Sequence, residues 1–248
     1  MQPQSVDSAR AVNWYGFGWR IFMANPGVWV AMMILIAVIM LVAQILPLVG
    51  PLALTLISPA LAGGLMYSAK EAAEGRSIET MHLFRGLTDE RKRAPLLVLG
   101  AVLLGLSILA GIAAVIVIGS SVGIGAFSGA TGKMHDAVGA AGAGMLLTFL
   151  IALIFSLAMF ALQAFSIPLV MFNDVAPIEA IKSSINASLR NVVPLIVFLV
   201  IYFALAIIAA IPFFVGFLAL GPVSVAALYA SFRDIFAPSA GVPEVPMP

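Results

Sequence analysis

Cysteine is absent from the chain, and histidine is nearly so, with two residues among 248. Without a thiol the chain can form no disulfide, present no thiolate nucleophile and bind no zinc or iron-sulfur cluster through sulfur. Both histidines, His82 and His135, fall outside the long apolar runs, so the axial ligands of a membrane haem are lacking too. We therefore expect no cofactor and no metal-binding residues.

Charge is also scarce, because charged residues make up 9% of the chain and the net charge is +1. This balance gives no electrostatic basis for binding nucleic acid. No Asp, Glu, Lys, Arg or His lies in the middle of a long apolar run, which excludes the usual proton relay and ion-coupling carboxylate of a membrane transporter. The phosphate-binding G-x-x-x-x-G-K loop and the H-E-x-x-H metalloprotease pattern are missing as well. The sequence predicts no catalytic residues and a protein that is not an enzyme.

Apolar residues are abundant, at 62% of the chain, and the mean hydropathy is +1.15. Soluble domains contain about 45 to 50% apolar residues, so the composition predicts an all-α integral membrane protein. A helix needs about 20 residues to cross a hydrocarbon core of about 30 Å. Six segments qualify as spans, namely 27–48, 51–69, 95–119, 145–172, 192–215 and 217–236.

The basic residues set the expected orientation of these spans. With the N-terminus in the cytoplasm, eleven of the twelve Lys and Arg residues lie on the inner side, and Lys133 alone lies outside. Such a bias orients membrane proteins. The stretch KEAAEGRSIETMHLFRGLTDERKR, residues 70 to 93, supplies six of the eleven. We predict a multi-pass protein of the bacterial inner (cytoplasmic) membrane with both termini in the cytoplasm.

The segments between and beyond the spans complete the predicted domain organisation. A single membrane domain runs over 27–236, between a cytoplasmic N-terminus, 1–26, and a Pro-rich cytoplasmic tail, 237–248. Within the membrane domain, 70–94 is predicted to be a charged cytoplasmic loop. The segment 120–144, rich in Gly, Ala and Ser, is predicted to be a flexible periplasmic loop.

Two stretches are typical of helices that lie at the membrane surface. Residues 176–191 place apolar side chains on one helical face and polar ones on the other. The N-terminal stretch places a belt of aromatic anchors beside the first span, namely Trp14, Tyr15, Trp19 and Phe22. Five basic residues are candidates for contact with anionic lipid headgroups or a docked protein, namely Arg91, Lys92, Arg93, Lys182 and Arg190.

An internal repeat links the two ends of the membrane domain. Residues 25–70 and 191–233 each begin with Asn and a nearby Pro, run apolar to a Pro and a Gly, and end after a second Pro with Tyr and a basic residue. This pattern predicts two parallel copies of one helical hairpin, formed by spans one and two and by spans five and six. The repeated prolines are expected to be structural helix breaks, at Pro47, Pro59, Pro212 and Pro222.

Several motifs carry a family resemblance that covers nearly the whole chain except the Gly-rich loop. They are W-x-x-F from Trp19 to Phe22, NPGVWV at 25–30, SPALAGGL at 58–65, LFRG at 83–86, and P-x-E-A-x-x-x-S-x-x-A-x-x-x-N from Pro177 to Asn191. In these motifs the chain resembles a family of uncharacterised six-helix inner-membrane proteins of proteobacteria, which has no assigned activity. The resemblance implies a fold and a cellular place, and it supplies no catalytic residues.

The sequence leaves three functions open. The absent chemistry and the apolar helix faces favour a non-catalytic accessory or assembly subunit that packs laterally against a larger membrane complex of respiratory or photosynthetic type. The alternatives are a small-solute transporter or channel, and a protein of lipid or envelope homeostasis. Polar residues inside the spans discriminate between them, since convergence on one cavity favours transport and dispersal among helix contacts favours the accessory role. The expected partners are membrane lipids and an integral-membrane protein.

Overall fold

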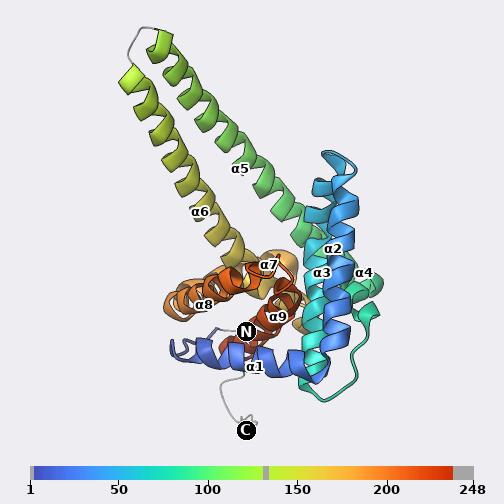
Figure 1. Cartoon of the computed structure of the whole chain (residues 1–248). Helices are drawn as coiled ribbons and strands as arrows, with labels where there is room; N and C mark the ends of the chain where they lie inside the picture. The colour runs from blue at the N-terminus through green and yellow to red at the C-terminus, as the bar shows by residue number, and fades with distance from the viewer. Residues whose placement is uncertain (1–2, 131–133, 237–248) are drawn as a thin grey trace. The chain divides into compact units, whose positions relative to one another are not determined.

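The computed structural model describes residues 3–130 and 134–236, and every regular element in this part of the chain is helical (Figure 1). In chain order the elements are α1 (Arg10–Ala24), α2 (Pro26–Gln44), α3 (Val49–Ala73), the 3-10 helix η1 (Thr80–Phe84), α4 (Arg85–Thr88), α5 (Glu90–Ala130), α6 (Met134–Asn173), α7 (Pro177–Arg190), α8 (Val192–Ala210) and α9 (Phe217–Phe236).

Five of the described helices are long and apolar enough to cross a membrane. They are α2, α3, α8, and the segments Glu90–Ser120 of α5 and Gly142–Asn173 of α6. The predicted sixth span corresponds to α9, which is not among them. Half of its 20 residues are buried inside the protein, and its last turns contain Arg233 and Asp234. The sixth crossing therefore stays a prediction.

The helices α5 and α6 are longer than the sequence suggested. The expectation of a flexible loop over 120–144 is wrong for 120–130 and 134–144, which continue the two helices. No proline occurs between Pro95 and Pro168 to stop either helix. The helices continue there although glycine, a poor helix former, is as frequent as alanine in 120–130 and 134–144.

The chain divides into two compact units, which are described separately. Unit 1 contains the residues up to Gly100 and those from Ala161 onward, and unit 2 is Ala101–Phe160. Unit 2 therefore consists of the adjoining parts of α5 and α6, and all the other helices belong to unit 1.

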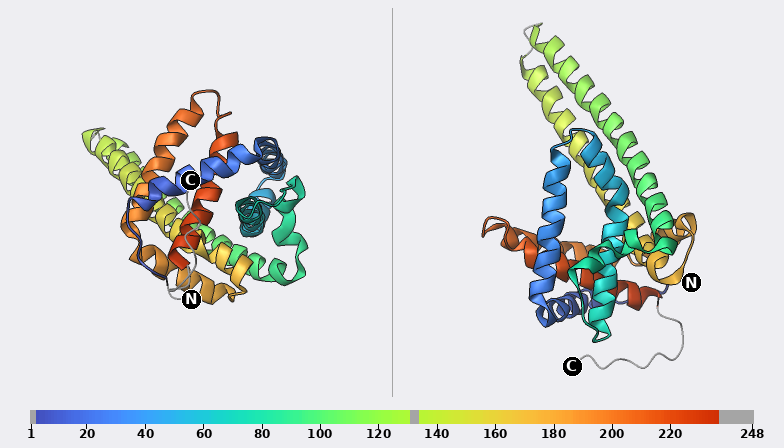
Figure 2. Two further views of the ribbon diagram at one scale, coloured as in Figure 1. Left: turned by 90° about the horizontal axis from the view of Figure 1, so that it is seen from below. Right: turned by 90° about the vertical axis from the view of Figure 1, so that its right-hand side faces the viewer.

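In unit 1, two groups of helices run in different directions (Figure 2). The left view shows α2 and α3 end-on but α1, α8 and α9 side-on, so these three helices lie across the α2–α3 hairpin. The central helix is α9, which contacts α1 most extensively and also touches α2, α3 and α8. At the closest approach, a Cβ on Gly18 of α1 would overlap the carbonyl oxygen of Val223 in α9.

The turns of the α2–α3 and α8–α9 hairpins share two features, although in the second turn Phe213 also has a positive φ, of 50°. Leu48 in the first turn and Phe214 in the second both have φ of 66°, in the left-handed region that costs an L-residue roughly 1 to 2 kcal/mol. Two residues further on lie Gly50 and Gly216, and a Cβ on either would overlap the alanine seven residues before it. Each turn is thus closed by the same pair of features.

The four repeated prolines have two different positions. Pro47 and Pro212 lie in the hairpin turns, outside the helices. Pro59 and Pro222 lie inside α3 and α9, which continue through them. The prediction that these two prolines end a helix is therefore wrong. Both are buried, and packing around them holds the helices continuous.

Candidate functional site

The SPALAGGL motif in α3 combines a proline with the donor that compensates for it. Pro59 has no N–H for the carbonyl of Thr55. The hydroxyl of Ser58 donates to that oxygen instead, at 2.9 Å. The carbonyl that Pro59 leaves free is therefore bonded within α3 itself.

The LFRG motif packs directly on SPALAGGL. A Cβ on Gly86 would overlap the backbone of Ala60, and a Cβ on Gly64 would overlap the carbonyl of Leu83. Leu83 is fully buried in this contact. Two of the family motifs are therefore the two sides of one backbone contact, which holds η1 and α4 against α3. The charged loop 70–94 is a folded part of unit 1.

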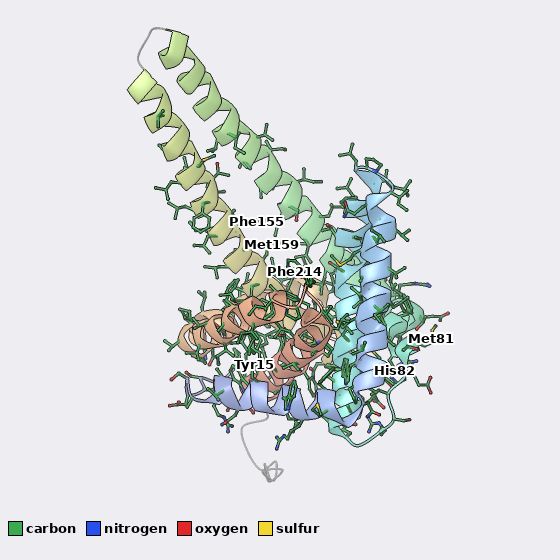
Figure 3. The ribbon with its side chains drawn as sticks, viewed as in Figure 1. Tyr15, Met81, His82, Phe155, Met159 and Phe214 are labelled. Atoms are coloured by element: carbon green, nitrogen blue, oxygen red, sulfur yellow. The ribbon has the colours of Figure 1, made fainter. Side chains whose placement is uncertain are left out.

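The charges at the start of this loop are paired with one another. Arg76 donates to both carboxylate oxygens of Glu71, at 2.5 and 2.6 Å, and forms an ion pair with Glu74. The hydrogen bonds to Glu71 raise the pKa of the Arg76 guanidinium above its usual range. Further along, His82 lies edge-on to Tyr67 with 5.2 Å between the ring centroids (Figure 3). The charges of Glu71, Glu74 and Arg76 therefore stabilise the fold of the loop itself.

One of the five basic candidates, Lys92, is used inside the protein. Its ammonium donates to the Asp174 carboxylate at 2.6 Å and to the carbonyl of Val170 at 3.2 Å. These bonds tie the start of α5 to the end of α6, and only 13% of the Lys92 side chain is exposed. The Lys92 hydrogen bond lowers the pKa of the Asp174 carboxyl below its usual range. Lys92 is therefore not available for headgroups or a docked protein.

The other four basic candidates lie at the surface, two on α5 and two on α7. Arg91 and Arg93 are exposed at the start of α5. Lys182 pairs with Glu179 on α7 at 2.8 Å, and Arg190 donates to a backbone carbonyl of the N-terminal segment at 3.3 Å.

The P-x-E-A motif of α7 inserts a hydroxyl into α6. A regular helix would bond the Phe165 N–H to the Ala161 carbonyl. Here the Phe165 N–H donates to Ser184 Oγ at 3.1 Å, and Ser184 Oγ donates to the Ala161 carbonyl at 2.7 Å. Pro168 lies in the next turn of α6, and a proline together with an inserted side chain is a recognised cause of a helix kink. The Ser184 hydroxyl links these two backbone groups and fixes α7 to α6.

The remaining surface of α7 agrees with a position at the membrane surface. Its buried residues are small and spaced by three or four, namely Ala180, Ser184, Ala187 and Ser188. The apolar face predicted from the sequence points outward, with Ile178 and Leu189 exposed. An amphipathic helix with an uncovered apolar face suits the boundary between headgroups and acyl chains.

The N-terminal strap, residues 3–8, joins the α7–α8 junction to the end of α9. Asn191 accepts the Val6 N–H at 2.9 Å and donates to the Gln4 carbonyl at 3.0 Å. Gln4 donates its backbone and side-chain N–H groups to two carbonyls at the end of α9, at 2.9 and 2.5 Å. The sequence reasoning missed this strap. The sequence feature that could have indicated the strap is Asn191, a polar residue between two predicted helices. The structure shows that this side chain is 1% exposed.

Three of the four predicted aromatic anchors lie inside the protein. Trp14, Tyr15 and Phe22 are buried, and Trp19 alone presents its ring at the surface, 53% exposed. Trp14 donates its indole N–H to the Asp234 carboxylate of α9 at 2.7 Å, and Tyr15 lies between α1 and α8 (Figure 3). Large aromatic rings with a polar tip fill cores as well as interfaces, and here α8 and α9 supply the partners.

Four of the hydroxyls inside the spans are bonded within their own helices. The hydroxyls of Thr55, Ser68, Thr148 and Ser156 each donate to a carbonyl of their own helix, four residues earlier. A depression of about 420 Å³ lies between the strap and the start of α8. In the part of the chain that the structure describes, no three His, Asp or Glu side chains are grouped as metal ligands.

These helices and contacts define an all-helical protein of the multi-pass membrane class. A family profile described as "Domain of unknown function (DUF7847)" matches residues 13–245, and the chain belongs to this family. A search of the curated proteins and a search of the solved structures gave no match. The matched range takes in every helix from α2 to α9 and most of α1.

Proposed function

We propose that the protein is a non-catalytic membrane subunit that packs laterally against a larger integral-membrane complex. The observation that most supports this proposal is the low burial of α5 and α6. Almost none of the residues in their apolar spans are buried, whereas nearly half are buried in α3. Two long helices whose apolar spans are so little buried offer their faces to lipid or to a neighbouring protein.

The glycines of α5 favour a neighbouring protein over lipid alone. In unit 1, Gly64 and Gly86 each permit a backbone contact that any side chain would block. In unit 2, by contrast, a Cβ on Gly105, Gly111 or Gly119 would meet no heavy atom within 4 Å outside its own helix backbone. Glycine lowers helix stability, by roughly 0.5 to 1 kcal/mol relative to alanine. In membranes its common use is to let another helix approach closely.

The bonding of the span hydroxyls supports an accessory role over transport. A transport path needs polar groups that turn toward a shared cavity. The hydroxyls of Thr148 and Ser156 of α6 each donate a hydrogen bond to a carbonyl of their own helix. Serine and threonine in membrane helices commonly make this bond when no other partner is present. We propose no substrate for this protein.

The orientation and the repeat belong to the same proposal. Both ends of the chain lie on the cytoplasmic side of the bacterial inner membrane, together with 70–94, since eleven of the twelve basic residues then stay inside. The hairpins α2–α3 and α8–α9 are two copies of one hairpin pattern, although they run in different directions in unit 1. Their support is the pair of equivalent turn residues, Leu48 with Gly50 and Phe214 with Gly216.

Native electrophoresis with mass spectrometry, after extraction of the tagged protein in mild detergent, tests the function. We expect co-migration with a large complex at fixed stoichiometry. Migration as a monomer or a small homo-oligomer would overturn the proposal and turn attention to flux and lipid-binding assays.

A variant of α5 sharpens this test. Gly111→Leu adds a side chain where the chain itself leaves space, so the isolated protein should fold normally but lose co-migration. Ile112→Leu is the matched control, because it keeps the volume of a residue that is already 54% exposed. Equal co-migration of both variants would show that this face of α5 contacts lipid only.

A further inference from the structure

The α8 helix presents an apolar face that no described part of the chain covers. The exposed residues follow one another at intervals of three and four, namely Val193, Ile196, Val200, Phe203, Ile207 and Ile211, each between 53% and 76% exposed. Leu195 and Phe198 are buried on the opposite side. The hydroxyl of Tyr202 is the only side-chain polar group in the helix. Unlike α7, α8 has no polar face for water, so its whole outer surface suits acyl chains.

The turn after α8 is equally apolar. Residues 211–217, IPFFVGF, contain no polar side chain. Phe213 is 93% exposed and Phe214 is 69% exposed (Figure 3). Two exposed phenylalanines at the tip of a hairpin are unfavourable in water, because a large apolar surface stays hydrated.

The backbone of this turn is largely satisfied by internal hydrogen bonds. Of the six N–H groups that residues 211–217 carry, four donate within the chain: Ile211, Phe214, Val215 and Phe217, at 3.0 to 3.3 Å. Pro212 has no N–H. Irregular backbone is costly in hydrocarbon because each unpaired polar group costs several kcal/mol. Most of the N–H groups of this turn are therefore already paired within the protein and do not need water as a partner.

The direction of the hairpin decides how deep it reaches. Figure 2 shows α8 and α9 side-on where α2 and α3 are end-on, so the two hairpins of unit 1 cannot both run along the membrane normal. Both helices of the α2–α3 hairpin qualify as spans, whereas in the α8–α9 hairpin α8 qualifies and α9 does not. With α2–α3 upright, α8 lies close to the membrane plane, and its tip stays on the side it entered from.

We propose that α8–α9 is a re-entrant hairpin whose outer face and tip bind the acyl chains of one leaflet. The hairpin enters and leaves on the side of residues 70–94, and Phe213 and Phe214 remain in hydrocarbon. This replaces a fifth and sixth crossing and still returns the C-terminus to the side of the N-terminus. The inference goes beyond the proposed function, since it holds with or without a protein partner.

The natural absence of cysteine makes a single-cysteine experiment direct. In Phe213→Cys, we expect no reaction with a membrane-impermeant maleimide in intact cells or in inverted vesicles. The same site, labelled with a fluorophore in detergent and reconstituted, should be quenched by nitroxides on lipid acyl chains more strongly than by a water-soluble quencher. Met81→Cys is the matched control, because Met81 is 63% exposed on η1 and should react from one side only.

Each result has a distinct meaning. Reaction of Phe213→Cys from the side opposite to Met81→Cys would show that α8–α9 crosses the membrane, and would overturn the proposal. Reaction from the same side as Met81→Cys would place the tip in water and overturn it equally.

A second control is Val138→Cys, which lies beyond the apolar span of α6. This cysteine should react only from the membrane side opposite to Met81→Cys. Elution of each variant as a single species in detergent confirms folding, and the native electrophoresis outcome is independent of all three.

Discussion

At the scale of single residues, the fold is held by close backbone contacts and by a few hydroxyls. Gly86 meets the backbone of Ala60, where a side chain has no room. We expect Gly86→Ala to lower the free energy of unfolding by about 1 to 3 kcal/mol, as overpacking does, because a backbone cannot move aside as a side chain can. Gly105→Ala is the same change in open space and should cost nothing. Denaturant titration in detergent, followed by circular dichroism, compares them.

Ser184 gives a second prediction at this scale. Ser184→Ala leaves the Phe165 N–H without its acceptor and the Ala161 carbonyl without its shortest donor. A buried polar group left unpaired costs about 1 to 3 kcal/mol. Ser183→Ala changes the neighbouring residue, which is not fully buried, and should be nearly neutral. Equal stability of the two variants in a thermal unfolding assay would mean that the inserted hydroxyl does not hold α7 to α6.

At the scale of elements, the Lys92–Asp174 pair joins α5 to α6. The pKa of Asp174 is lowered in the fold by the Lys92 hydrogen bond, so its stabilising contribution is fully present above the ordinary carboxyl pKa of about 3.9. The contribution is lost as the pH falls through the lower, folded pKa. Asp174→Asn should therefore unfold at a lower temperature than the natural protein at pH 7. The difference should shrink below about pH 4, and a difference independent of pH would contradict the pairing.

At the scale of the whole molecule, the strap connects the first residues to the last helix. Removing residues 1–8 leaves the Asn191 side chain with one of its three hydrogen bonds, to the Ala187 carbonyl. We expect a loss of about 1 to 3 kcal/mol and faster hydrogen exchange at the end of α9, measured by mass spectrometry. Removal of residues 1 and 2 alone keeps the bonds of Gln4 and Val6, and serves as the control. Unchanged exchange after the longer deletion would show that the strap does not hold α9.

The sequence predicted the helical class, the two tight hairpins and the amphipathic α7, because these depend on local patterns. It did not predict that Trp14 and Tyr15 face α9 and α8, or that Leu83 of the charged loop is buried on α3. In a soluble protein an apolar side chain points to the core. In a membrane protein lipid is as apolar as the core, so hydrophobicity alone does not say which face of a helix meets protein.

The strap also sets an order of events during synthesis. Gln4 and the Asp234 carbonyl that it bonds are 230 positions apart, so the strap has no partner on α9 until almost the whole chain has left the ribosome. At about 5 to 20 residues per second, the first residues wait between about 10 and 50 s. Closure of the strap on α9 therefore follows the synthesis of α9, and a chain that terminates before α9 is distinguished by a loose N-terminus that proteases can reach.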